Sequence, residues 1–194
     1  MIKYFESVLR TLENSLNSLN EERFKQLINE SVETIENGKK IVVSGLGKNV
    51  PVCDKFVGTM NSLGQNACFM NTNSAVHGDI GMVHEGDLVI VLTKSGETVE
   101  SVYLTQLLKK RNTNIWLLSF KEESTLTNQI EKCIILNIDN EGDQWNIIPN
   151  NSTTINLIIL QGLAIEIVNR RGVTLHDFKI NHPGGYIGEQ LKNE

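Results

Sequence analysis

Cysteine, proline and aromatic residues are scarce in this chain of 194 residues. It contains 3 cysteines and 3 prolines, and 6% of its residues are aromatic. The cysteines are isolated and odd in number, so we expect reduced core thiols at Cys53, Cys68 and Cys133 rather than a disulfide framework or a CxxC metal site. Apolar runs of the roughly 18–20 residues that span a bilayer are also missing, as is a signal sequence at the N-terminus. We therefore expect a cytoplasmic protein that does not enter a membrane.

Positive charge is not in excess either. The 18 lysines and arginines stand against 23 aspartates and glutamates, which gives a net charge of −5. Proteins that bind nucleic acid usually present a basic face, so this balance argues against a nucleic-acid partner. An anionic small substrate stays open, because backbone dipoles at helix N-termini bind phosphate even in acidic proteins.

What the chain does have is enough length and apolar content for one compact domain. Its residues are 40% hydrophobic, and a single domain usually takes about 100–200 residues. We expect N-terminal helices over residues 1–37, an α/β core over residues 38–172 and a turn-rich C-terminal tail over residues 173–194.

Short apolar segments alternate with helical patterns along the core. The apolar segments predict five strands, at residues 41–43, 66–70, 87–93, 115–119 and 133–138. Helical spacing predicts helices at residues 2–19, 21–37, 50–63, 98–111, 122–131 and 152–171. Residues 71–86 and 139–151 are expected as loops. This alternation is typical of a parallel sheet covered on both faces, so the sequence predicts a three-layer αβα sandwich of the Rossmann-like or flavodoxin-like class with a five-stranded parallel sheet.

Three unusual loops, at residues 44–48, 94–98 and 139–151, follow predicted strands. Ligands of parallel sheets sit beyond the carboxyl ends of the strands, so these loops predict the site. In the loop 94–98 (KSGET), Gly96 allows a tight turn and the hydroxyls of Ser95 and Thr98 can reach one anion. The alternative is a simple helix cap that binds nothing.

The loop 44–48 (SGLGK) adds a hydroxyl, two glycines and a cation. It lacks the GxxxxGK[ST] spacing of a nucleotide-binding P-loop and the third glycine of a GxGxxG motif, so we expect no nucleotide cofactor. Two of the four histidines, His77 and His182, lie in polar, glycine-containing segments. No histidine pair has HxxxH or HExxH spacing and no GxSxG motif occurs, so we expect neither a metal site nor a serine hydrolase.

Five motifs occur in a fixed order along the chain: 45–48 (GLGK), 77–82 (HGDIGM), 94–100 (KSGETVE), 149–154 (PNNSTT) and 182–188 (HPGGYIG). Together they resemble the sugar isomerase (SIS) domain family, and within it the arabinose 5-phosphate isomerase branch, over about residues 20–192. The SGET segment alone indicates only a SIS domain, whereas the HGDxGM and HPGGxxG motifs are specific to that branch.

The resemblance implies isomerisation between D-arabinose 5-phosphate and D-ribulose 5-phosphate, without a cofactor. It implies catalytic roles for four residues: Lys48, Glu100, Glu141 and His182. It also implies a substrate-binding set of nine residues, most of them around the phosphate: Ser44, Gly45, His77, Ser95, Gly96, Glu97, Thr98, Ser152 and Thr153. Residues 49 and 50 are Asn and Val where the family usually has Ser and Gly, which predicts a reshaped loop. Many relatives carry CBS domains after this domain, so a chain ending at residue 194 is expected to lack regulation through them.

The chemistry expected of this set is transfer of a proton between C1 and C2 through a cis-enediol. The base is His182, Glu100 or Glu141, and the sequence leaves the choice open. Lys48 and His77 would orient and polarise the sugar oxygens. Apolar stripes on the two N-terminal helices, together with the family's habit of building sites at subunit contacts, predict a dimer or tetramer in which His182 or His77 comes from a neighbouring copy.

Three other functions remain open from the sequence. One is a different phosphosugar isomerase, such as a 3-hexulose-6-phosphate isomerase, against which the HPGG turn argues. Another is a module that senses a sugar phosphate without turnover, against which the retention of all four catalytic positions argues. A SIS domain of the etherase or deaminase type would be expected to bring additional domains.

Overall fold

The sheet consists of five parallel strands. The structure is a computed structural model that describes residues 1–191; the end of the predicted tail, residues 192–194, lies outside the described residues. The strands, in the spatial order β2-β1-β3-β4-β5, are β1 (Ile41–Gly45), β2 (Ala67–Asn71), β3 (Leu88–Leu92), β4 (Asn114–Ser119) and β5 (Cys133–Ile135). All four neighbouring pairs are parallel. The strands therefore share a carboxyl edge, where they end, and an amino edge, where they begin.

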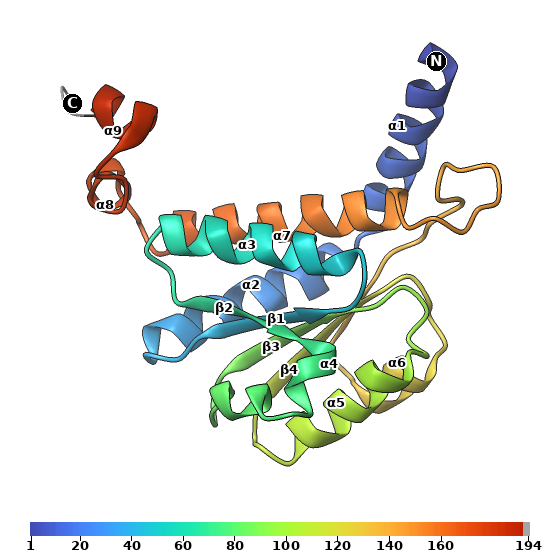
Figure 1. The fold of residues 1–194 in the computed structure, drawn as a ribbon, viewed down its shortest axis with the longest axis horizontal. Helices are drawn as coiled ribbons and strands as arrows, with labels where there is room; N and C mark the ends of the chain where they lie inside the picture. Colours follow the sequence, from blue (N-terminus) through green and yellow to red (C-terminus); the bar gives the residue numbers. More distant parts are fainter. Residues whose placement is uncertain (192–194) are drawn as a thin grey trace.

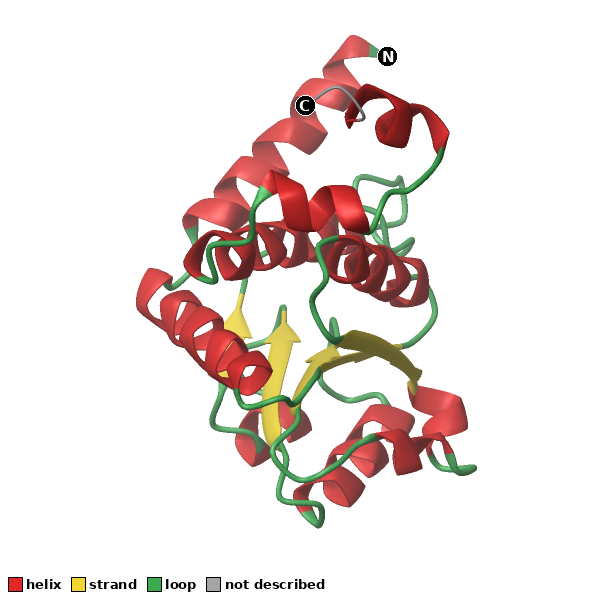
Figure 2. Cartoon of the chain, turned by 90° about the vertical axis from the view of Figure 1, so that its left-hand side faces the viewer, coloured by secondary structure: helices red, strands yellow, loops and turns green. Residues whose placement is uncertain are grey.

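Helices cover both faces of the sheet, which gives three layers (Figures 1 and 2). The helices up to the last strand and the long one after it are α1 (Ile2–Asn17), α2 (Glu21–Glu36), α3 (Asn49–Ser62), α4 (Thr72–Ala75), α5 (Val99–Lys109), α6 (Thr125–Gln129) and α7 (Asn151–Arg170). In Figure 1, α2, α3 and α7 lie on one face, and α4, α5 and α6 on the other. The predicted αβα sandwich is confirmed.

Each layer of helices packs on its own hydrophobic core. Alternate residues of a strand point to opposite faces. In β1, Ile41 and Val43 belong to the core under α2, α3 and α7, whereas Val42 belongs to the core under α4, α5 and α6. The strand residues are buried from both sides, which explains why β1 and β3 read as continuous apolar segments rather than as alternating ones.

The structure corrects two segments that the sequence left without helices. Residues 71–86, predicted as a loop, contain α4 and the 3₁₀ helix η1 (Asp79–Met82). The turn-rich tail contains α8 (Leu175–Ile180) and α9 (Gly185–Leu191). These helices have four to seven residues, too few for an apolar stripe to repeat, and side-chain caps define two of them: Asn71 accepts from the Asn73 amide at α4, and Thr174 accepts from the Asp177 amide at α8.

A further correction concerns long apolar segments. Within the described residues, α7 is the one helix that is long and apolar enough to cross a membrane by length and composition, which differs from the expectation that the chain has no such segment. Half of its apolar segment is buried inside the protein, where Ile155, Leu160 and Leu163 pack in the larger core. Packing between the sheet and its neighbouring helices accounts for its apolar composition.

Candidate active site

The loops predicted to carry the chemistry meet at the carboxyl edge. The chain runs from β1 outward to β2 and then returns to place β3 on the other side of β1. The direction of winding therefore reverses between β1 and β3, the place where open parallel sheets bind ligands. The segment after β1 leads into α3 on one face, and the segment after β3 leads into α5 on the other. Residues 44–48 and 94–98 thus both lie at this switch point, one on each side of the sheet.

The loop after β3 is held in a fixed conformation. Gly96 is buried with φ +70°, its N–H donates to the Thr93 hydroxyl at 3.0 Å, and its carbonyl accepts from the Leu126 N–H at 3.1 Å. The exposed Ser95 hydroxyl accepts from the Glu97 N–H at 3.2 Å. Thr98 precedes α5 without a side-chain capping bond. The loop therefore presents the Ser95 and Thr98 hydroxyls beside the N–H groups of the first turn of α5, an arrangement suited to an anion.

The Glu97 side chain forms its hydrogen bonds with Thr125, outside the loop 94–98. Its carboxylate accepts from the Thr125 N–H at 2.8 Å and from the Thr125 hydroxyl at 2.7 Å. The hydrogen bond from the Thr125 hydroxyl, and to a lesser degree the one from the Thr125 N–H, holds the pKa of the Glu97 carboxyl below its ordinary value. The carboxylate ties the loop to the start of α6, and the substrate-binding role of Glu97 stays a prediction.

The loop after β1 lies at the same switch point as the loop 94–98. Ser44 is fully buried, and its hydroxyl lies 2.9 Å from the Thr72 hydroxyl on α4. At Gly45 a Cβ atom would come within 2.9 Å of the Asn49 Cβ, so the close approach of α3 to the end of β1 requires a glycine. Lys48 is exposed immediately before α3, at the carboxyl edge. Its charge is therefore available to a ligand bound at the carboxyl edge.

His77 and Glu100 share one pocket. They line a mostly apolar pocket of about 400 Å³ together with Thr72, Asn73, Val76, Val99 and Tyr103. Glu100 occupies the first turn of α5 and His77 follows α4, and both are exposed. Since Thr72 also contacts Ser44, this pocket adjoins the loop after β1. The structure thus brings together a carboxylate and an imidazole that the sequence separates by 23 positions.

Glu141 is the most heavily bonded of the predicted site residues. It is fully buried, and its carboxylate accepts from the Ser152 hydroxyl at 2.6 Å, from the Ser152 N–H at 2.9 Å and from the Asn150 N–H at 3.0 Å. The Lys94 ammonium lies 2.6 Å from its Oε1. Burial pushes the pKa of Glu141 upward, but the hydrogen bonds from Lys94 and Ser152 together outweigh it and hold that pKa below its ordinary value. Glu141 is a carboxylate anchor for the start of α7.

Lys94 was missed by sequence reasoning. It stands directly before the SGET segment, and its side chain is 42% exposed although its ammonium reaches a buried carboxylate. A cation beside an anion-binding loop was the available signal. Its partner could not be found from sequence, because Lys94, after β3, and Glu141, before α7, meet only in the folded chain, where Lys94 and residues 138–140 line one pocket.

The remaining predicted substrate-binding residues at this edge, Ser152 and Thr153, lie in the first turn of α7. Ser152 is buried against Glu141, and the Thr153 hydroxyl donates to the carbonyls of Asn150 at 2.9 Å and of Pro149 at 3.1 Å. Both hydroxyls stabilise the N-terminal turn of the helix. Their predicted substrate contacts stay predictions.

We expect Glu141 to make stability depend on pH. Because its pKa is lowered by folding, the unfolded chain binds more protons once pH falls below the ordinary value of 4.5. The stabilisation is therefore present above that value and is lost as pH falls through the folded pKa. In Glu141→Gln, we expect a loss of about 2 kcal/mol at neutral pH and a shallower decline toward about pH 4, measured by chemical denaturation. Identical acid slopes for Glu141→Gln and the unmodified protein would contradict this role.

His182 lies at the opposite edge of the sheet from the other predicted catalytic residues. It follows α8, which packs beside the turn that leads into β2: a Cβ on Gly64 would come within 3.2 Å of the Asn181 side chain. Figure 1 shows α8 and α9 at the far end of α7 from the segment 139–151. The His182 ring is stacked on Phe178 with centroids 3.9 Å apart, and its Nδ1 lies 2.8 Å from the Phe178 carbonyl oxygen. A single chain does not bring His182 to Lys48, His77 or Glu100.

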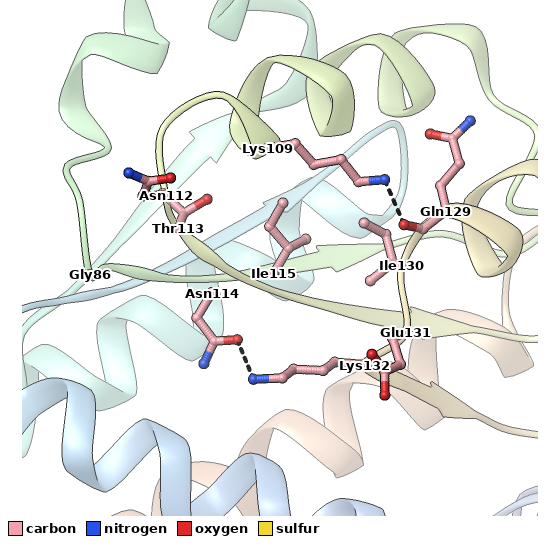
Figure 3. Close-up of a pocket in the computed structure, with 10 residues that line it drawn as sticks. All are labelled: Gly86, Lys109, Asn112, Thr113, Asn114, Ile115, Gln129, Ile130, Glu131 and Lys132. Atoms are coloured by element: carbon pink, nitrogen blue, oxygen red, sulfur yellow. Dashed lines mark hydrogen bonds between the residues drawn. The ribbon is translucent and has the colours of Figure 1, made fainter.

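The pocket drawn in Figure 3 does not belong to this site. It has a volume of about 540 Å³ and lies at the amino edge between β4 and the segment before β5 (Figure 3). Its lysines already have partners: Lys109 donates to the Gln129 carbonyl at 2.6 Å, and Lys132 donates to Asn114 at 3.0 Å and to Glu30 at 2.9 Å. Among residues 1–191, no three His, Cys, Asp or Glu side chains gather in a way that could hold a metal ion.

Comparison with known proteins shows the family to which this chain is similar. A model of the SIS domain matches residues 34–166. Arabinose 5-phosphate isomerase KdsD of Pseudomonas aeruginosa is 35% identical over 152 residues, which cover 78% of this chain and 47% of that protein. The protein of the same name from Francisella tularensis is 28% identical over 190 residues, which cover 98% of this chain and 58% of that protein. The chain spans about half the length of the curated relatives it matches.

Solved structures match over nearly the whole chain. A candidate phosphosugar isomerase involved in capsule formation from Bacteroides fragilis superposes with a TM-score of 0.87 and 27% identity, covering 96% of this chain and 99% of that one. An Escherichia coli protein in complex with arabinose 5-phosphate superposes with a TM-score of 0.85 and 28% identity, covering 94% and 95%. Motifs, sheet order and the matched model over residues 34–166 agree, and the chain belongs to the SIS domain family.

Proposed function

We propose that this chain is a phosphosugar aldose–ketose isomerase that interconverts D-arabinose 5-phosphate and D-ribulose 5-phosphate. The observation that carries the proposal is the pocket shared by His77 and Glu100 beside the fixed loop 94–98. It supplies an acid–base pair next to an anion-binding loop, which is what this reaction requires. The names of the relatives and the arabinose 5-phosphate complex of the Escherichia coli protein support this choice of substrate.

The phosphate of the substrate binds the loop 94–98. The hydroxyls of Ser95 and Thr98 and the free N–H groups of the first turn of α5 bind its oxygens. Because Gly96 and Glu97 are tied to the loop's surroundings by hydrogen bonds, the loop is organised before the substrate arrives. Binding energy from the phosphate then positions the sugar for reaction.

The reaction moves one hydrogen between adjacent carbons. Glu100 removes the proton from C2 of the aldose, the electron pair forms the C1–C2 double bond of a cis-enediol, and the proton returns to C1 while a hydroxyl proton moves from O2 to O1. Lys48 and His77 stabilise the negative charge that develops on the oxygens. C2 is oxidised and C1 is reduced within the same molecule, so the redox balance closes without an external acceptor.

Glu141 has a positioning role in this proposal. Its carboxylate is occupied by Lys94, Ser152 and the Asn150 N–H, so little of its lone-pair capacity is left for a substrate proton. Its lowered pKa also makes it a weak base. The choice among the three candidate bases therefore falls on Glu100 within one chain, with His182 as a second acid–base group.

A second copy of the chain brings His182 to the site. The described structure leaves apolar side chains exposed on α1, on the loop before α7 and on α9: Ile2, Phe5, Leu9, Trp145, Ile147, Tyr186 and Ile187. Apolar patches of this kind mark interfaces between subunits. We propose a homo-oligomer, a dimer or a tetramer, whose contacts place the 182–188 motif of one copy at the carboxyl edge of another. We also propose that the protein is cytoplasmic, as the sequence predicts.

The proposed function is tested by assay of the purified protein on D-arabinose 5-phosphate, with hexulose and sedoheptulose phosphates as competitors. We expect turnover of the pentose phosphate and a loss of about a thousandfold in kcat in Glu100→Gln. Glu131→Gln is the matched control, because Glu131 lines the pocket at the amino edge and should leave the rate unchanged. Binding of the sugar phosphates without turnover of any of them would instead support a sensor, and unchanged rates in Glu100→Gln would remove Glu100 as the base.

A further inference from the structure

Two asparagines join the first residue of α3 to the second turn of α7. The Nδ2 of Asn156 donates to the Oδ1 of Asn49 at 3.0 Å. Asn156 is 1% exposed, whereas Asn49 is partly buried at the carboxyl edge. The Asn49 Oδ1 accepts this hydrogen bond. The two N–H donors of the Asn49 side-chain amide have no acceptor among the described residues, so they remain for another partner.

The buried amide is only half satisfied. The Oδ1 of Asn156 has no hydrogen-bond partner among the described residues, one of three such buried side-chain atoms. In either orientation of the two amides, a single bond between them leaves one polar group of Asn156 unpaired. An unpaired buried polar group destabilises a fold by roughly 1–3 kcal/mol, so an apolar side chain here would be more stable. The cost at this position points to a role in function.

The position of Asn49 indicates what that role is. Asn49 directly follows Lys48, and its Cβ lies where it packs on the end of β1 at Gly45. It therefore lies beside Lys48, the residue proposed to act on the sugar oxygens, rather than in the phosphate-binding loop 94–98.

We propose that Asn49 binds a hydroxyl group of the sugar phosphate and that Asn156 is the positioning residue that holds the Asn49 amide in place. The inference rests on the proposed function for the identity of the ligand. The Asn49 N–H donates to the hydroxyl oxygen, while the Asn49 Oδ1 stays bonded to Asn156. The pair thereby favours ligands with a hydroxyl at the reacting end over a bare phosphate.

Binding measurements test the pair without requiring turnover. D-Arabinitol 5-phosphate, which has every hydroxyl but no carbonyl, is compared with inorganic phosphate by calorimetric titration. We expect Asn49→Ser and Asn156→Leu each to weaken the polyol phosphate about tenfold and to leave inorganic phosphate unchanged. Because Asn156 acts through Asn49, the double variant should be no weaker than either single one. We also expect Asn156→Leu to raise the melting temperature, which loss of a purely structural bond would not do.

The outcomes separate this inference from the proposed function. A protein that binds the polyol phosphate more tightly than phosphate but turns over no sugar would refute the isomerase, while the effect of the two variants would still decide the role of the pair. Equal affinity for the two ligands, equal weakening of both by the substitutions, or additive losses in the double variant would each overturn the pair. Asn66→Ser, at the exposed residue before β2 on the amino edge, is a control expected to preserve the preference for the polyol phosphate.

Discussion

Gly96→Ala is expected to destabilise the protein by about 3 kcal/mol and to abolish binding of the phosphate group. Gly96 has φ +70°, which side-chain-bearing residues rarely adopt, and a Cβ here would come within 2.0 Å of the Ser124 hydroxyl oxygen and 2.6 Å of the Ser124 Cβ. Ser124 caps α6 and is itself buried, so it has little room to move away. The loop would have to shift, which would disturb the hydroxyls of Ser95 and Thr98.

Thermal unfolding and titration with inorganic phosphate measure the two effects. We expect the melting temperature of Gly96→Ala to fall by roughly 10 °C. Gly47→Ala is the matched control, because Gly47 also has a positive φ, +55°, but a Cβ there meets nothing within 4 Å. That substitution should cost about 1 kcal/mol, from the backbone conformation alone. Equal losses in the two variants would show that contact with Ser124 contributes nothing.

Features that depend on local sequence could be predicted. The strands follow from short β-branched runs such as Ile41–Val43, and the edge that carries the site follows from the rule that parallel strands end together. The start of α5 after the loop 94–98 also follows from local signals, because Thr98 and Glu100 are typical of a helix N-terminus. Residues close together in the sequence determine these features.

Features that depend on packing between distant segments could not be predicted. Lys94 and Glu141 are 47 positions apart, and Glu97 and Thr125 are 28 apart, and no pattern in the chain pairs them. The location of His182 also depends on packing between distant segments. Its neighbours form two short helices whose placement depends on contacts with the turn at Gly64. A motif that matches a catalytic position in sequence can therefore lie at the opposite edge of the sheet from the other catalytic positions of the same chain.

This separation leads to the prediction that two inactive variants restore activity when they assemble together. If each site combines Glu100 from one copy with His182 from another, Glu100→Gln and His182→Ala should each be inactive alone. In a mixed dimer, the site built from the Glu100 of the second variant and the His182 of the first is intact, and the other site carries both substitutions. We therefore expect isolated mixed dimers to show about half of the unmodified activity.

The two variants are co-expressed with different affinity tags, and mixed oligomers are isolated by two successive purifications before the assay. Glu100→Gln paired with Lys48→Met is the matched control, because both residues lie at the carboxyl edge of the same chain and every mixed site would lack one of them. Restoration in the first pair and its absence in the second would show that the subunits share their sites. If neither pair regains activity, His182 does not act across the interface, and the catalytic assignment of the 182–188 motif loses its structural basis. Mixing therefore distinguishes a site completed by a second copy from one in which His182 has only a structural role on α8.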